Sequence, residues 1–440
     1  MKPLRVLVGV VVAAGAVVAG VAVLPSLWDG AGGTPARDRL PVAPMVVRKN
    51  VWLDAQGTVV EELPDDCADS RHPYFCQRVK TEVGTHDERL LARGGLTIRT
   101  TLDQTMQEAS QRAVDAYVHR DDPQVAGQAM VVPGSGEIRA LATSRGTGEP
   151  RGLQQGSTAM AYTLAAAFEN GLRSEDGFAV SGSYRMPGFA AFRDCQDRKV
   201  GDPTHEVVDP RRADRFHTLR SGTRETVPTF FMRLEEKVGL CETVEMARRL
   251  GLARADGHPL SEYATFTLGI NEVDPVSVAT SYATFAARGR HCAPMAVTEI
   301  RADSGTVRSF VPRCRQVLDP AVADAVTGVL SDAAGDAVKG IGRDVAGLPG
   351  TVDAHAAAWY AGYTPGLASA VGLGDSRGGF RHPLTDVTIG GRLYSSVPGS
   401  SIPARIWKDS MTAAVRGTEE TAFVKPDAGR FGGCREACAR

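Results

Sequence analysis

The sequence has no surplus of positive charge, because 50 Lys and Arg residues stand against 51 Asp and Glu residues. A net charge of −1 argues against a nucleic-acid binder, since such proteins need a basic surface to attract phosphates. Lysine itself is scarce, with 8 residues against 42 arginines. No internal repeat or low-complexity block is present, and 43% hydrophobic residues exclude wholesale disorder. The length allows roughly two or three domains.

A long apolar run lies near the N-terminus. Val6–Leu24 contains no charged residue, and Lys2 and Arg5 precede it. Such a run can span a hydrocarbon core of about 30 Å as a helix, and the basic flank predicts a cytoplasmic N-terminus. The alternative is a cleaved signal peptide, whose apolar part is usually shorter, roughly 7–15 residues. Under both interpretations the rest of the chain is exported, and we expect a single-pass membrane anchor with the C-terminal part outside the cytoplasm.

The cysteines include no C-x-x-C pair, and no histidine cluster accompanies them, so we expect neither a metal site nor another cofactor. The count of 8 is even, which in an exported chain indicates disulfides. Short loops make three pairings the simplest and leave a fourth, although the sequence alone leaves the connectivity open: Cys67–Cys76, Cys292–Cys314, Cys434–Cys438 and Cys195–Cys241.

The hydrophobic pattern predicts an α+β domain, with strands early and late and helices between them. We expect a stub and anchor over 1–29, an extracytoplasmic linker over 30–93, the folded domain over 94–415 and a tail over 416–440. Predicted strands cover 96–101, 128–132, 137–141, the region of Val345, 357–363 and 367–374. Predicted helices follow Asp103 as N-cap and cover 158–168, 229–238, 279–287 and 319–330, whereas 178–225 reads as irregular and polar.

Several segments, taken in order over about residues 70–415, resemble the transpeptidase domain of class A penicillin-binding proteins. They are Tyr74-Phe75, Arg93–Asp103, Gly156–Thr158, Leu164–Gly171, Thr267–Val273, Tyr282–Gly289, Trp359–Pro365, Gly374-Asp375 and Ile406–Lys408. The resemblance implies an antiparallel sheet flanked by helices, the fold shared with serine β-lactamases. It also implies peptidoglycan synthesis as the setting. Residues 30–93 are too few for the glycosyltransferase domain that precedes this region in class A members.

That family uses three motifs, Ser-x-x-Lys, Ser-x-Asn and Lys-Thr-Gly. A serine hydroxyl is a weak nucleophile until a nearby base removes its proton. A lysine three residues later lies on the same helix face and can be that base. In the family, the second motif supplies a hydroxyl and an orienting amide, and the third supplies a cation for the substrate carboxylate.

All three motifs are altered in this chain. Ser157 keeps the nucleophile position, but Met160 replaces the lysine and has no amine to accept a proton. The second motif falls on Thr226-Val227-Pro228, where Pro228 has no side-chain amide. The third falls on Leu348-Pro349-Gly350, followed by Thr351. There Leu348 removes the cation, and Pro349 has no N–H to donate.

Simpler interpretations exist for the same residues. Ser157 follows a glycine and is explained equally well as a helix N-cap, and Thr226 as a turn or cap residue. Met160 then packs as an apolar residue that seals the former site. Thr351 retains a backbone N–H near the former oxyanion position. The Arg-rich run Pro210–Arg224 is explained as a solvated loop or as a surface for an acidic partner or lipid headgroups.

Two functions follow from these observations. The first is a catalytically inactive, membrane-anchored binding or scaffold protein, with a wall precursor, a muropeptide or a cell-wall synthesis protein as partner. The second is a slow serine acyl-enzyme, either a D,D-peptidase or a β-lactam-binding sensor. It would use Ser157 with a base other than lysine, such as His205 or His217.

Overall fold

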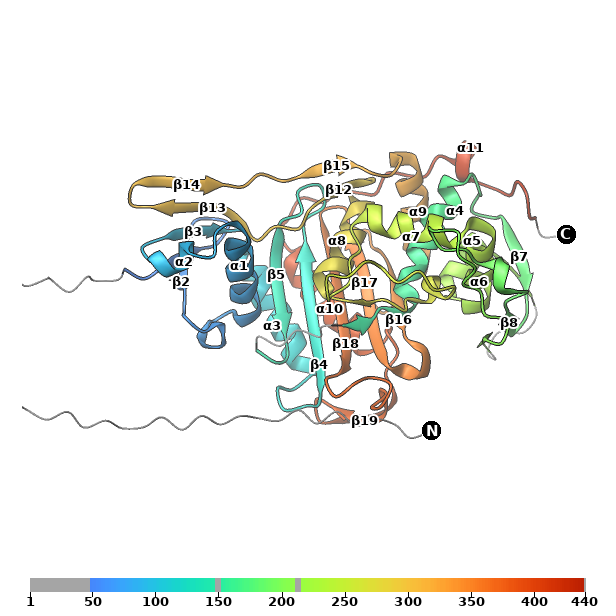
Figure 1. Cartoon of the computed structure of the whole chain (residues 1–440), viewed down its shortest axis with the longest axis horizontal. Coiled ribbons are helices and arrows are strands. Elements are labelled where there is room, and N and C mark those ends of the chain that lie inside the picture. Colours follow the sequence, from blue (N-terminus) through green and yellow to red (C-terminus); the bar gives the residue numbers. More distant parts are fainter. Residues whose placement is uncertain (1–47, 147–151, 210–214, 439–440) are drawn as a thin grey trace, which may run out of the picture. The chain divides into compact units, whose positions relative to one another are not determined.

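An antiparallel sheet of five strands forms the centre of the described structure (Figure 1). Its strands, in spatial order, are β16 (Ala346–Thr351), β17 (Ala357–Thr364), β18 (Leu367–Asp375), β4 (Gln124–Val131) and β5 (Ile138–Thr143). The early hairpin and the three late strands therefore join in one sheet, as the sequence predicts. β16 is an edge strand, which explains how it accommodates Pro349.

The structure is a computed structural model that describes residues 48–146, 152–209 and 215–438. The apolar run Val6–Leu24, and with it the expected anchor, lies outside the described residues. Within the described ranges, no helix has both the length and the apolar character needed to cross a membrane.

The two faces of the sheet carry different hydrophobic clusters, because side chains alternate along each strand. On β17, Ala358 and Tyr360 belong to one cluster, and Trp359, Ala361 and Tyr363 belong to the other. Helices α3 (Gln104–Tyr117) and α10 (Ile402–Ala414) cover the first face. Helices α8 (Pro275–Ala286) and α9 (Pro320–Ala333) cover the second face.

Helix α4 (Met160–Glu169) lies among other helices on this second side. Its residues 160–168 are all buried, and a helix that is apolar all round is typical of a protein interior. The helices packed around α4 are α6 (Pro228–Val238), α7 (Leu240–Leu250), α9 and the short α5 (Leu219–Arg224). The predicted caps of two other helices are confirmed, since Asp103 and Asp319 accept N–H groups at the starts of α3 and α9.

Residues 48–93 do not form the linker that the sequence suggests. They contain β1 (Val51–Leu53), β2 (Val59–Glu62), η1 (Cys67–Asp69), α1 (Pro73–His86) and α2 (Leu90–Arg93). Strand β1 pairs in parallel with β3 (Thr97–Thr100), inside a second sheet that also holds β13 (Val297–Ala302) and β14 (Gly305–Ser309). Trp52 and Phe75 are fully buried and stacked. The linker interpretation is wrong here because these strands, three or four residues long, are too brief to show a period.

The polar stretch 178–225 is more ordered than its composition indicates. Its described part holds short strands, which pair two by two, together with a short helix. The strands are β7 (Gly177–Val180) with β10 (Arg215–Thr218), and β8 (Ser183–Arg185) with β9 (Glu206–Val208). The remaining short elements of the described chain are β6 (Leu153–Gln154), β11 (Glu272–Val273), β12 (Arg290–Cys292), β15 (Cys314–Gln316), β19 (Thr385–Ile389), β20 (Arg392–Ser396), η2 (Gly156–Ala159), η3 (Phe189–Ala191), η4 (Phe266–Leu268), η5 (Asp353–His355) and α11 (Ala428–Phe431).

The three short-loop cysteine pairings and the fourth that they leave are all present as disulfides: Cys67–Cys76, Cys292–Cys314, Cys434–Cys438 and Cys195–Cys241. The Cys434–Cys438 disulfide closes a ring in the stretch that the sequence suggests is a tail. That stretch is anchored, because the Asp176 carboxylate accepts N–H groups from Arg435 and Glu436 at 2.7 and 2.8 Å. In addition, Phe431 is buried against Phe168 of α4. Four disulfides fit an oxidising compartment.

Candidate functional site

Ser157 lies where the chain passes from β6 into η2 and α4. β6 pairs with β11, and the carbonyl of Gly269 accepts the N–H groups of Gln155 and Gly156. Gly156 has φ +59°, and a Cβ built on it would lie 2.8 Å from the carbonyl carbon of Thr351. Only glycine fits this position, which brings the serine motif directly against the strand of the third motif.

A second glycine contact locks the same point from the other side. A Cβ on Gly269 (φ +77°) would lie 2.2 Å from the carbonyl oxygen of Gly156. A Cβ on Gly350 would lie 2.4 Å from the carbonyl oxygen of Gln155. We call the stacked backbones of Thr351, Gly156 and Gly269 the glycine clasp. It joins β16, η2 and the loop after η4, and so it sets the position of Ser157.

The Ser157 hydroxyl is half-buried and has no hydrogen-bond partner among the described residues. The N-cap interpretation of this serine is wrong, because Ser157 lies inside η2, whose N-cap is Gln155. The neighbouring Thr158 makes the local bond instead, donating its hydroxyl to the Gln155 carbonyl at 2.9 Å. Nothing in the described structure therefore withdraws the Ser157 proton.

Met160 and Leu348, the residues expected at the two lysine positions, are both fully buried. They belong to one hydrophobic cluster, which also contains most of α4 and α8. Residues two apart on a strand point to the same face. The Leu348 side chain therefore lies on the face of β16 where a Cβ added to Gly350 would lie, toward η2. If the motif positions are as the sequence predicts, both places that hold a cation in the family motifs are apolar here.

The second motif forms a turn between α5 and α6. Thr226 has φ +48° and donates its hydroxyl to the carbonyl of Glu225 at 2.8 Å. Pro228 is the first residue of α6, a position that needs no N–H donor. The alternative interpretation of Thr226 as a turn residue is thus the one that the structure favours. No hydrogen bond joins its hydroxyl to Ser157.

Thr351 lies at the end of the edge strand and makes a contact that sequence reasoning missed. Its hydroxyl accepts the N–H of Gly399 at 3.1 Å. Since Val352 donates to Ala357 across the hairpin, ladder alternation turns the N–H of Thr351 away from β17, toward the open edge. The Thr351 N–H is thus outside the β16–β17 ladder, while Pro349 on the same edge has no N–H.

The two histidines proposed as substitute bases lie in the polar stretch before α5. His205 is exposed in the turn that begins at Asp202. His217 is fully buried in β10, with its ring 6.4 Å from that of Phe230. Neither imidazole makes a hydrogen bond to Ser157, so the apo geometry gives the serine no histidine base.

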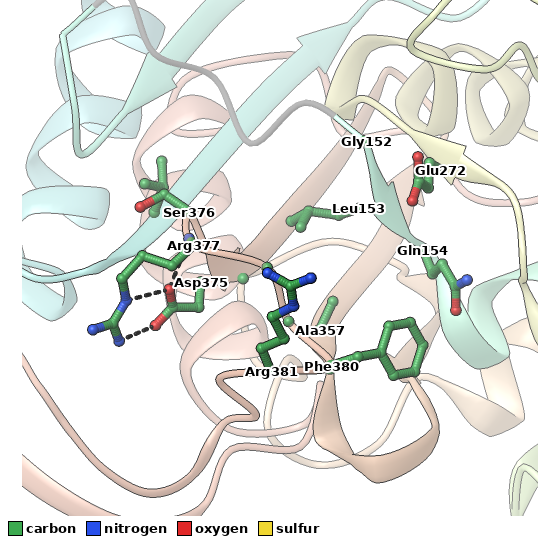
Figure 2. Close-up of a pocket in the computed structure, with 15 residues that line it drawn as sticks. Gly152, Leu153, Gln154, Glu272, Ala357, Asp375, Ser376, Arg377, Phe380 and Arg381 are labelled. Carbon is green, nitrogen blue, oxygen red and sulfur yellow. Dashed lines mark hydrogen bonds and ion pairs between the residues drawn. The ribbon is translucent and has the colours of Figure 1, made fainter. Parts of the chain in front are cut away.

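β6 also forms one wall of a cavity of about 470 Å³ (Figure 2). Leu153 and Gln154 line it from β6, and Asp375 and Arg377 line it from the end of β18 and the loop that follows. Ser157 and the residues of the other two motifs are not in its lining. The cavity is therefore separate from the motif positions, although Gln154 precedes Ser157 by only three positions.

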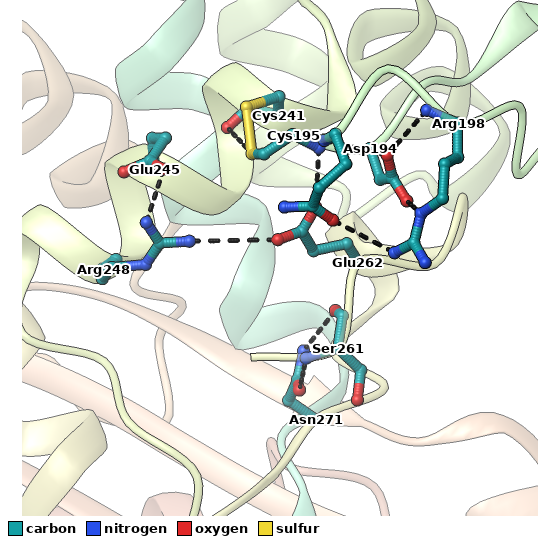
Figure 3. Close-up of polar contacts among 10 residues, drawn as sticks. Asp194, Cys195, Arg198, Cys241, Glu245, Arg248, Ser261, Glu262 and Asn271 are labelled. Atoms are coloured by element: carbon teal, nitrogen blue, oxygen red, sulfur yellow. Dashed lines mark hydrogen bonds and ion pairs between the residues drawn. A yellow bond between two sulfur atoms is a disulfide. The ribbon is translucent and has the colours of Figure 1, made fainter. Parts of the chain in front are cut away.

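Polar contacts hold the loop that carries Gly269 (Figure 3). Asn271 closes this loop by accepting the N–H of Ser261 at 2.8 Å. The neighbouring Glu262 accepts the N–H of Cys195 at 2.7 Å, and Cys195 is bonded to Cys241 of α7. The disulfide and the Glu262 carboxylate thus tie the polar stretch to the loop that supports the glycine clasp.

Glu235 of α6 is fully buried beside η4, and among the described residues its carboxylate oxygens accept only the Thr267 N–H, at 3.1 and 3.3 Å. Burial raises its pKa well above the usual value, and the Thr267 N–H offsets only part of this effect. No pattern in the sequence marked this residue, because Glu235-Glu236-Lys237 resembles an exposed helix face.

We expect Glu235→Gln to remove a pH dependence of stability. A carboxyl with a raised folded-state pKa takes up a proton on folding, so the wild type loses stability as pH rises from about 4.5 through that pKa. Urea denaturation at about pH 5 and pH 8 should show the variant gaining on the wild type at the higher pH. Glu88→Gln, at an exposed position, is the control. Parallel pH profiles for wild type and Glu235→Gln would contradict this account.

Comparison with known proteins agrees with the geometry. No protein-family model matches the chain. Penicillin-binding protein 1A of Mycolicibacterium smegmatis is 30% identical over 383 residues, which cover 80% of this chain and 46% of that protein. Penicillin-binding protein 1A of Mycobacterium tuberculosis is 28% identical over 374 residues, covering 78% and 43%. The solved structure of PonA1 from M. tuberculosis gives a TM-score of 0.67 at 25% identity, covering 82% of this chain and 94% of that one.

This chain has the transpeptidase fold of the class A penicillin-binding proteins. The resemblance inferred from the motifs and their order is confirmed. The chain spans about half the length of the curated relatives it matches. The three motif positions stay predictions of the sequence, and sequence reasoning did not identify the contacts of Gly269, Gly399 and Glu235. Gly269 lies in the segment Thr267–Val273 that carries part of the resemblance, whereas no local pattern pointed to Gly399.

Proposed function

We propose that this chain is a catalytically inactive transpeptidase homologue that binds rather than cross-links. One observation carries the proposal: Met160, which the sequence places where the family has its lysine base, is fully buried, and the Ser157 hydroxyl has no base to bond to in the described residues. Leu348 at the second lysine position supports it, because a buried leucine cannot hold a substrate carboxylate.

The proposed setting is outside the cytoplasm, with the Val6–Leu24 segment as membrane anchor. The four disulfides support export. PonA1, which shares the fold, has been solved in complex with penicillin V. We propose a peptidoglycan precursor, a muropeptide or a cell-wall synthesis protein as partner, and we propose no nucleic acid and no metal or other cofactor.

Labelling of the full-length chain by a fluorescent penicillin tests the proposal. A general base typically contributes about 10²–10⁴-fold to such a step, so we expect at least about 100-fold slower labelling than for an active transpeptidase. Ser157→Ala is the matched variant, and a thermal melt of both proteins checks that they are folded. Rapid labelling that Ser157→Ala abolishes would overturn the proposal.

The slow acyl-enzyme has one observation in its favour, which is that Ser157 is only partly buried and directly follows Gly156, whose backbone packs against that of Thr351. Slow penicillin labelling that depends on Ser157, and that His205→Ala or His217→Ala abolishes in a folded protein, would distinguish this slow acyl-enzyme from the inactive homologue. Labelling unchanged in both histidine variants would exclude these bases.

A further inference from the structure

The cavity beside β6 offers charged groups that the protein itself does not neutralise (Figure 2). Arg377 is not one of them, because its guanidinium forms two hydrogen bonds to Asp375 at 2.9 and 2.8 Å. Arg381 follows in the same loop. Its guanidinium points into the cavity and has neither an ion pair nor a hydrogen bond with any described residue.

A carboxylate stands on the opposite wall. Glu272 of β11 lies against Gly152, where a Cβ would come within 3.4 Å of its Oε2. Its carboxylate accepts no hydrogen bond from any described residue, and the cation that its charge influences, Arg254, is already bonded to Asp256. The Gln154 amide, also in the lining, has no side-chain partner there. One wall thus presents an available cation, and the other presents an available anion.

The surface between these charges is apolar. Leu153 fills the space above Gly374, where a Cβ would lie 2.5 Å from its Cδ2. The Phe380 ring at the other side is 63% exposed, which is unusual for a large aromatic side chain at a cavity. A volume of about 470 Å³ with apolar walls and a few converging polar groups is typical of small-ligand sites.

We propose that this cavity binds a small zwitterion with an apolar side chain, either a free amino acid or a short peptide. Arg381 binds its carboxylate through the paired N–H groups of the guanidinium, and Glu272 binds its ammonium group. Leu153 and Phe380 enclose the apolar side chain. Binding at this cavity requires no chemistry at Ser157, so it can be tested independently of the proposed loss of catalysis.

β6 leads directly into η2, so the backbone of Gln154 and Gln155 connects the cavity to the glycine clasp. Ligand binding therefore stabilises the folded chain as well as filling the cavity, by the usual linkage between binding and stability.

Isothermal titration calorimetry on the full-length chain tests the proposal, with phenylalanine and alanyl-phenylalanine as the two probes. N-acetylphenylalanine lacks the ammonium group, and phenylalaninamide lacks the carboxylate. We expect each to bind about tenfold more weakly than the parent, as expected for losing one charged hydrogen bond. Tight binding of phenylalanine alone identifies an amino acid site, and tight binding of the dipeptide alone identifies a peptide site.

Two variants assign the charges. Arg381→Gln should abolish the preference for phenylalanine over phenylalaninamide, and Glu272→Gln should abolish the preference over N-acetylphenylalanine. Arg392→Gln, an exposed arginine of β20 outside the cavity, should bind like the wild type. The proposal is overturned by the absence of binding of both probes up to about 10 mM, or by affinities that do not depend on either charge.

Discussion

Gly269→Ala should lower the free energy of unfolding by more than about 3 kcal/mol, because two effects combine at this residue. Its φ of +77° disfavours any side chain, at about 1–2 kcal/mol. The added Cβ would also lie 2.2 Å from the carbonyl oxygen of Gly156 and 2.4 Å from its nitrogen. Both obstacles are backbone atoms, so no side-chain rotation relieves the contact.

Gly257→Ala is the matched control, since Gly257 lies in the same connection between α7 and α8. Its φ is +76°, but nothing lies within 4 Å of the added Cβ. It should lose only about 1–2 kcal/mol, so the difference between the variants measures the clasp itself. Urea denaturation of the full-length chain gives both values. Equal losses for the two variants would show that the clasp is not rigid and that Ser157 is free to move relative to β16.

The glycine clasp has a consequence for function. It holds Ser157 against the third-motif strand through backbone atoms alone, and it needs none of the side chains that the chain has lost. A scaffold of this kind keeps its shape after its catalytic groups change. The clasp is therefore compatible with the fold persisting around the three motifs that the sequence predicts to be altered, as the proposed function requires.

The elements with strong periodicity were predictable from the sequence, and those held by distant contacts were not. Asp103 and Asp319 are local signals, since each caps the helix that begins at the next residue. The predicted strands 357–363 and 367–374 are likewise present, as the buried antiparallel pair β17 and β18. By contrast, β1 depends on pairing with β3, which is more than forty residues away, and its three residues show no period of their own.

The same distinction between local signals and distant contacts applies to the candidate site. The positions of Ser157, Thr226 and Leu348 follow from motif order, which is a property of the sequence. The hydrogen bond from Gly399 to Thr351 and the burial of Glu235 arise only when separate segments pack together. The N-cap interpretation of Ser157 was wrong for a related reason, because the packing of Gly156 against Thr351 makes the first turn a 3₁₀ turn with Ser157 inside it.

Met160→Lys should destabilise the folded chain by roughly 3–5 kcal/mol, the range measured for an uncompensated buried charge. The Met160 side chain is fully buried in a cluster of apolar residues, so a lysine here has no solvent to reach. Restoring the family residue therefore damages this protein, because the surroundings have become apolar along with the position.

Met160→Leu is the control, since a swap of similar volume in a core usually costs less than about 1.5 kcal/mol. The Met160→Lys, Leu348→Lys double variant should be less stable than either single variant, because both positions lie in the same buried cluster. Chemical denaturation measures the series, and penicillin labelling of whatever folds reads out function. If Met160→Lys is as stable as Met160→Leu, the cleft is open to water. The proposed loss of catalysis would then depend only on the missing lysine amine. Penicillin labelling of Met160→Lys would test this directly, because that variant restores the amine.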